Sequence, residues 1–142
     1  ILNNPNIFFI VPMHKNHKVR DHIIENLSNQ KNVNLIEPLK YDEFVFVMKN
    51  SFFIMTDSGG IQEEAPAFGK PVLILRNKTE RPEALDVGSS KLVGTNAKNI
   101  FIEANKLLND KKYYEKMAKS SNPFGDGNAS LKILYECKSF LK

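Results

Sequence analysis

Thr56-Asp57-Ser58-Gly59-Gly60-Ile61-Gln62-Glu63-Glu64 is the stretch that decides the fold. It follows a short apolar run at residues 52–55, and the apolar residues Ile61, Ala65 and Phe68 recur at helical spacing. The pattern predicts a strand, a tight turn and a helix that begins after Ser58, a residue type favoured as an N-cap. The two adjacent glycines allow the backbone to turn sharply and a ligand to approach the main chain closely.

The N-terminus of this predicted helix is a candidate anion site. Its first N–H groups have no partner within the helix and lie at the positive end of the helix dipole, so a phosphate would suit them. A simple helix cap would use the same residues, and the short motif alone does not separate the two interpretations. The residues around the motif have to decide between them.

Strands and helices alternate along the rest of the chain. Apolar runs predict strands at residues 7–11, 33–36, 52–55, 72–75 and 92–93. Apolar residues at helical spacing predict helices over residues 19–27, 44–48, 61–68, 100–108, 113–118 and 127–142, with a charged loop at 76–83. This alternation predicts an α/β fold, with a Rossmann-like parallel sheet covered by helices on both faces.

The carboxyl ends of the predicted strands form the expected ligand-binding rim, because open parallel sheets bind ligands there. The loops at this rim are residues 12–16, 37–41, 57–60 and 76–81. Ser58-Gly59-Gly60 offers backbone donors to a diphosphate, and Glu64 lies one helical turn further on. The Glu64 carboxylate could accept hydrogen bonds from hydroxyls such as those of a ribose.

Arg76 and Arg81 flank the charged loop at the same rim. An arginine fork can bind phosphate oxygens in bidentate fashion. A surface ion pair with Glu80 or Glu83 is the alternative for each arginine. Together with the helix N-terminus, the arginines favour phosphate binding.

Composition narrows the class of protein. The 142 residues fit a single domain, and the formal charge of +4 comes from lysines scattered among acidic residues, so a nucleic-acid partner is not expected. No apolar run is long enough to span a membrane, so a membrane partner is not expected either. The lone Cys137 cannot form an internal disulfide, which suits the cytoplasm, and we expect it to pack in the core. The chain begins at Ile1 and looks like a piece of a longer protein.

The histidines and Ser58 do not predict a metal site or hydrolase chemistry. His14, His17 and His22 match no structural zinc spacing, and Cys137 is far away in sequence. Ser58 lacks the Gly-x-Ser-x-Gly frame of a nucleophile elbow. No metal and no cofactor are therefore expected.

A longer ordered set of runs extends the opening stretch. It consists of Thr56-Asp57-Ser58-Gly59-Gly60-Ile61-Gln62-Glu63-Glu64-Ala65-Pro66, Gly69-Lys70-Pro71-Val72-Leu73, Arg76, Thr79-Glu80-Arg81-Pro82-Glu83-Ala84, Leu92-Val93-Gly94-Thr95 and Asn122-Pro123-Phe124-Gly125-Asp126-Gly127. The set resembles the non-hydrolysing UDP-N-acetylglucosamine 2-epimerases across essentially the whole chain. Those enzymes have two Rossmann-like halves facing a cleft, the GT-B arrangement, and this chain resembles only the C-terminal half.

The resemblance implies a role for each residue of the predicted UDP site. Ser58, Gly59 and Gly60 would hold the diphosphate of UDP, and Glu64 would bind the ribose hydroxyls. Arg81 would reach the phosphates at the cleft and is the one residue of this chain that we assign to catalysis.

Two further residues take roles from the resemblance. Phe44 would lie near the uracil, with core packing as the alternative. His14 matches a histidine that helps some family members bind a second, regulatory UDP-N-acetylglucosamine. His17 departs from the family pattern, which usually has proline at this position.

The implied reaction interconverts UDP-GlcNAc and UDP-ManNAc by loss and return of UDP. This chain would bind UDP, while the acid and base that transfer protons would lie outside it. The isolated chain would therefore be inactive. The last helix would pack against the missing N-terminal half, and the full enzyme could be a homodimer. The alternatives are half of a GT-B glycosyltransferase, half of a hydrolysing epimerase, or a non-catalytic nucleotide-sugar-binding module.

Overall fold

The computed structural model describes residue 1 and residues 4–141, which form two compact units. The first unit covers residues 1–46 and the second covers residues 47–142. Helix α2 (Tyr41–Asn50) begins in the first unit and ends in the second. The expectation of a single domain over the whole chain stays a prediction.

The first unit is a βαβ segment. Strand β1 (Phe9–Pro12), helix α1 (His17–Leu27) and strand β2 (Val33–Ile36) follow one another, and the two strands pair in parallel from Phe9 opposite Val33 onward. The Asn16 side chain caps α1 by accepting a hydrogen bond from the Lys18 N–H. A crossover helix between parallel strands is the arrangement that the sequence predicts for this part of the chain.

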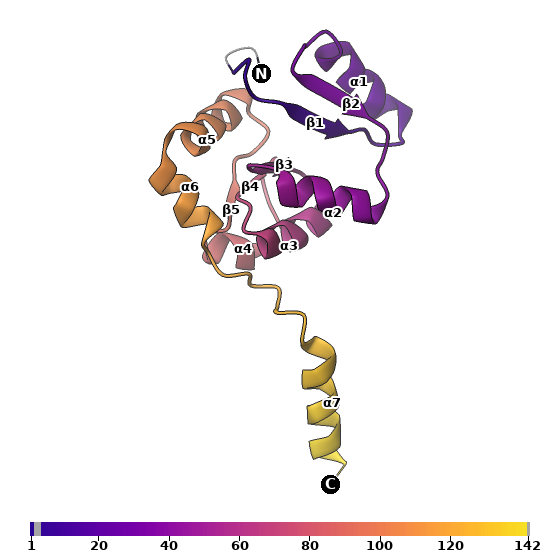
Figure 1. The fold of residues 1–142 in the computed structure, drawn as a ribbon, viewed down its shortest axis with the longest axis vertical. Coiled ribbons are helices and arrows are strands. Elements are labelled where there is room, and N and C mark those ends of the chain that lie inside the picture. Colours follow the sequence, from indigo (N-terminus) through magenta and orange to yellow (C-terminus); the bar gives the residue numbers. More distant parts are fainter. Residues whose placement is uncertain (2–3, 142) are drawn as a thin grey trace. The chain divides into compact units, whose positions relative to one another are not determined.

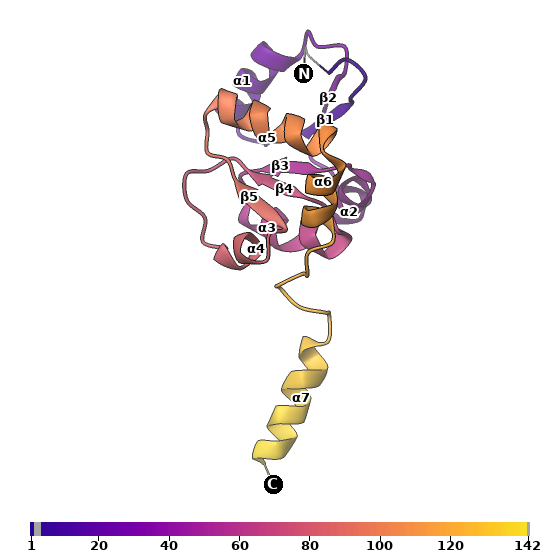
Figure 2. The same cartoon turned by 90° about the vertical axis from the view of Figure 1, so that its left-hand side faces the viewer.

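The second unit contains a three-stranded parallel sheet. Its strands are β3 (Ile54–Thr56), β4 (Val72–Ile74) and β5 (Ser90–Leu92), in the order β3-β4-β5. Its helices are α3 (Gly59–Glu64), the 3-10 helix η1 (Ala65–Phe68), α4 (Pro82–Asp86), α5 (Ala97–Asn109), α6 (Lys111–Ala118) and α7 (Ala129–Phe140). Figures 1 and 2 show α5 on one face of this sheet and α3 and α4 on the other. Parallel strands with helices on both faces confirm the predicted α/β class.

Strand β4 is the centre of the core because both of its faces are covered. Leu73 packs in a cluster with residues of α5 and α6, including Leu107 and Met117. Val72 and Ile74 point to the opposite face, where they pack with Ala65 of η1. Burial on both faces explains why this strand reads as a continuous apolar run in the sequence.

The structure shifts several of the predicted boundaries, and three of these shifts have a visible cause. Strand β3 begins at Ile54, because Phe52 lies before it and stacks on Tyr114 with ring centroids 4.2 Å apart. The predicted helix at 61–68 divides into α3 and η1 around Pro66, which has no N–H for an α-helical hydrogen bond. The predicted loop at 76–83 ends in α4, whose first residue is Pro82, a position that proline favours.

Helix α7 exposes its apolar residues. Leu131, Leu134 and Tyr135 are 66%, 50% and 73% exposed, and Cys137 is exposed as well. The expected core packing of Cys137 is therefore wrong for the chain as described, because α7 buries no residue. Within residues 1 and 4–141, no helix is long and apolar enough to cross a membrane.

The turn before α7 is held by side-chain hydrogen bonds. Asn122 accepts one from the Phe124 N–H and donates one to the Gly125 carbonyl. Asp126 accepts one from the Asn128 N–H at 3.0 Å and pairs with Lys132 at 3.0 Å. The bond from Asn128, followed by the one from Lys132, lowers the pKa of Asp126 from 3.8 to about 2.

The hydrogen bonds of Asp126 in this turn should be lost at low pH. The hydrogen bonds from Asn128 and Lys132 are made to the ionised Asp126 carboxylate. They therefore stabilise the folded turn fully above pH 3.8, and this stabilisation is lost as the pH falls through about 2. Lys132→Gln should raise the pKa of Asp126, while the bond from Asn128 keeps it below 3.8. NMR titration of the carboxylate in the wild type and in K132Q measures both values. A wild-type Asp126 that titrates at its ordinary pKa would contradict the described turn.

Candidate functional site

The carboxyl ends of the second unit's strands lie at one edge of the sheet. The parallel register places Thr56 beside Ile74, and Ile74 beside Leu92. The loops that leave β4 and β5 are close, since a Cβ at Gly94 would lie 3.1 Å from Asn77 Oδ1. The loops after β3 and β4 therefore start side by side at the edge where ligands of parallel sheets bind.

The turn after β3 presents free donors at the start of α3. Ser58 is the N-cap of α3 in an extended conformation, and its side chain makes no capping hydrogen bond. The Ser58 N–H donates to Thr56 Oγ1 at 3.0 Å, which fixes the residue before the helix. The N–H groups of the first helical residues have no partner within α3, as at every helix N-terminus. The Ser58 hydroxyl and the amides of Gly59 and Gly60 are thus available to a ligand.

Gly59 and Gly60 do not form an unusual turn. Gly59 and Gly60 are helical residues of α3, and neither is among the described glycines with positive φ. The expectation that they allow a sharp turn is therefore wrong in its reason, because any residue could adopt this backbone. The missing side chains instead leave the main chain open at the sheet edge.

Arg81 lies directly over Gly59. A Cβ at Gly59 would be 3.6 Å from Arg81 Nη2 and 3.7 Å from its Cζ. Arg81 Nε donates to Glu63 Oε1 at 2.5 Å, and Arg81 Nη1 lies 3.8 Å from Glu80. The hydrogen bond to Glu63 raises the pKa of Arg81, so the guanidinium is cationic at every accessible pH. Nε is occupied by Glu63, and Nη2 is the guanidinium nitrogen nearest the Cβ position of Gly59.

Glu64 and Ser58 lie beside Gly60. A Cβ at Gly60 would be 3.9 Å from Glu64 Oε1 and 4.0 Å from Ser58 Oγ. Ser58, Gly59, Gly60, Glu64 and Arg81 thus form one cluster, which we call the α3 turn site. It combines backbone donors, a hydroxyl, a cation and a carboxylate. This set can bind a diphosphate and a neighbouring hydroxyl-bearing group.

The contacts of the other predicted residues are as follows. Arg76 donates to Glu80 at 3.2 Å, which is the surface ion pair that the sequence offered as an alternative. His14 and Phe44 belong to the first unit. Phe44 is half-buried in α2, and exposed His14 accepts a hydrogen bond from the Asn16 N–H at 3.0 Å. Their roles toward a nucleotide stay predictions.

Comparison with known proteins places the chain in a family. The family model for UDP-N-acetylglucosamine 2-epimerase matches residues 1–137. The chain belongs to this family. The UDP-N-acetylglucosamine 2-epimerase of Campylobacter jejuni is 52% identical over 94% of the chain, and that of Salmonella typhimurium is 44% identical over 96%. The chain spans only about a third of these relatives, 35% and 36% of their lengths.

Solved structures agree with this family. The UDP-GlcNAc 2-epimerase of Neisseria meningitidis bound to UDP-GlcNAc matches 97% of the chain with a TM-score of 0.92 and 48% identity. The Staphylococcus aureus MnaA–UDP structure matches 94% of the chain with a TM-score of 0.88 and 48% identity. The chain covers 37% of each of these structures.

Sequence reasoning missed three residues of this family member that hold the site together. Glu63 fixes the Arg81 side chain, and Thr79 bonds both the Arg81 N–H and buried Gln62. The sequence did hold a clue to Gln62. It stands three residues before Ala65, so helical spacing places it on the inner face of the helix. A polar residue on a buried helical face needs a partner, and such a partner has to come from elsewhere in the fold.

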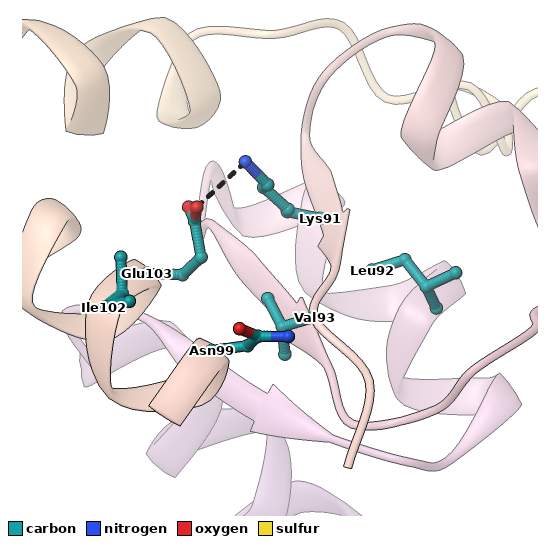
Figure 3. A pocket seen from close by; sticks show the side chains of 6 residues that line it. All are labelled: Lys91, Leu92, Val93, Asn99, Ile102 and Glu103. Atoms are coloured by element: carbon teal, nitrogen blue, oxygen red, sulfur yellow. Dashed lines mark ion pairs between the residues drawn. The ribbon is translucent and has the colours of Figure 1, made fainter. Parts of the chain in front are cut away.

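A hollow of about 200 Å³ lies away from the α3 turn site, between β5 and α5. Figure 3 shows its lining residues, Lys91, Leu92, Val93, Asn99, Ile102 and Glu103. Lys91 pairs with Glu103 at 3.0 Å, and the Tyr113 hydroxyl also donates to Glu103 at 3.0 Å. The bond to Glu103 raises the pKa of Lys91. The two opposite charges that line this hollow pair with each other.

Among residues 1 and 4–141, acidic, histidine and cysteine side chains do not gather into a metal site. Within the residues that the structure describes, no group of three or more is placed to hold an ion. The chemistry of the α3 turn site is that of donors and a cation, which suits an anion.

Proposed function

We propose that this chain is the UDP-binding, C-terminal half of a GT-B enzyme that interconverts UDP-GlcNAc and UDP-ManNAc without hydrolysis. The observation that carries the proposal is the position of Arg81 over Gly59 at the N-terminus of α3. A guanidinium beside the free backbone donors of a helix N-terminus is an arrangement that suits a diphosphate. Relatives of this chain include structures described as bound to UDP or UDP-GlcNAc.

The α3 turn site acts on the leaving group of this reaction. In the elimination step C2 loses its proton, the bond between C1 and the UDP oxygen breaks, and a glycal and UDP result. In the return step the UDP oxygen attacks C1 and a proton is added to C2 from the other face. Arg81 and the amides of Gly59 and Gly60 stabilise the charge that develops on the departing diphosphate. Glu64 binds the ribose hydroxyls.

The remaining parts of the proposal lie outside this site. Phe44 lies near the uracil, and His14 contributes to a second, regulatory UDP-GlcNAc site. The acid and base that move the C2 proton come from the N-terminal half, so this chain alone does not turn over substrate. The exposed apolar residues of α7 pack against that half. A cytoplasmic location and a homodimer remain predictions.

The activity test uses the natural full-length protein with UDP-GlcNAc in deuterated water. The expected result is UDP-ManNAc with deuterium at C2, detected by NMR, because the returning proton comes from the solvent. Release of free ManNAc would instead indicate a hydrolysing epimerase, and transfer of the sugar to an acceptor a glycosyltransferase. UDP binding without any turnover would indicate a binding module.

A further inference from the structure

Gln62 and Thr79 form a hydrogen-bonded link to Arg81 that the proposed function does not yet use. Gln62 lies in α3 and is fully buried at 0% exposure. The Thr79 hydroxyl donates to Gln62 Oε1 at 2.6 Å. The same hydroxyl accepts a hydrogen bond from the Arg81 N–H at 3.1 Å.

The direction of these bonds makes Gln62 an anchor. A hydroxyl has one proton, which here goes to Gln62, so its lone pairs remain for the Arg81 N–H. The loop before Arg81 is otherwise open to solvent, since Asn77, Lys78 and Glu80 are exposed. The buried amide therefore fixes the loop two residues before the arginine, and Glu63 on the same helix fixes the arginine side chain.

The core gains little from a glutamine at this position. In the described part of the chain, Gln62 Nε2 is buried and has no hydrogen-bond partner. An unpaired buried donor is destabilising, and an apolar residue of similar size would avoid that cost. Gln62 is thus better explained by the loop that it holds than by core stability.

We propose that Gln62 and Thr79 are positioning residues that hold Arg81 over Gly59 for a nucleoside diphosphate. This inference rests on the proposed UDP site. Neither residue touches the ligand. Their effect on binding passes through Arg81 alone, and this property separates a positioning role from a general contribution to folding.

The test is a double-mutant cycle on the UDP Kd of the natural full-length protein. Thr79→Val removes the hydroxyl and keeps the shape, and we expect it to weaken UDP binding about five- to tenfold, the effect of one hydrogen bond. Thr79→Ser keeps the hydroxyl and should restore the wild-type Kd to within about twofold. In an Arg81→Ala background, T79V should change the Kd by less than about twofold, because the residue it positions is gone.

A second variant separates positioning from stability. Gln62→Leu removes the anchor together with the unpaired amide, so the Tm should stay the same or rise while UDP binding weakens. Equal losses of affinity from T79V with and without Arg81 would overturn the proposal, as would a Tm and an affinity that fall together in Q62L. A wild-type protein that does not bind UDP would overturn the proposed function and this inference with it. UDP binding that is lost in R81A but unchanged in T79V would overturn the inference alone.

Discussion

Replacing Arg81 with alanine is expected to weaken UDP binding about ten- to a hundredfold, the range for loss of hydrogen bonds to a charged group. Arg81 Nη2 lies 3.6 Å from the Cβ position of Gly59, so the guanidinium stands beside the first residue of α3. The wild-type and R81A proteins are compared by calorimetric titration with UDP. The folded structure should survive the change, because Arg81 is partly exposed at 34% and pairs with Glu63 near the surface.

Two further variants show whether charge or geometry matters at this position. Arg81→Lys keeps the positive charge but loses the fork, and should recover only part of the lost affinity, because an ammonium cannot bind two phosphate oxygens side by side. Lys78→Ala removes a charge from the same loop away from the α3 turn site and serves as the matched control. If K78A weakened UDP binding as much as R81A, the effect would be one of net charge, and the assigned role of Arg81 would be wrong.

Replacing Gly59 with alanine is expected to leave the fold intact and to weaken UDP binding about ten- to thirtyfold, as expected when more than one hydrogen bond to the ligand is lost. Gly59 has no positive φ, and its added methyl would stand 3.6 Å from the nearest Arg81 atom, an ordinary contact. The free protein can therefore accept the methyl without strain. It would occupy the space between the guanidinium and the N-terminus of α3, where the proposal places the diphosphate.

The comparison of stability with affinity makes this variant informative. Alanine is the better helix former, so the Tm of G59A should equal or slightly exceed that of the wild type. UDP binding is measured by the same titration, with K78A again as the reference. If G59A bound UDP as tightly as the wild type, the turn would be only a helix cap, which is the alternative that the motif alone left open.

The order of strands and helices could largely be predicted from local sequence patterns. The apolar run at β4 predicts a strand covered on both faces, and the structure buries Val72, Leu73 and Ile74 completely. Boundaries were less predictable, because contacts between distant residues set them. Phe52 belongs to an apolar run but stacks on Tyr114, which ends up beside it only in the folded chain.

The exposure of α7 was not predictable from its sequence. Its apolar residues at helical spacing indicate a buried face, yet Leu131 and Tyr135 are 66% and 73% exposed. A periodic pattern reports that a helix has an apolar side but not what covers that side. The covering surface has to be found in the fold or in a partner.

The sequence by itself determined that two glycines follow an apolar strand and open a helix, and that an arginine follows the next strand. Only the tertiary structure decided that the arginine lies over the first glycine, with Glu63 and the pair of Gln62 and Thr79 holding it. The physical reason is the register of the sheet, which places Thr56 beside Ile74 and so brings together residues about 18 positions apart, such as Glu63 and Arg81. Contacts at that separation depend on which strands pair and in which register, and this is decided when the whole sheet forms.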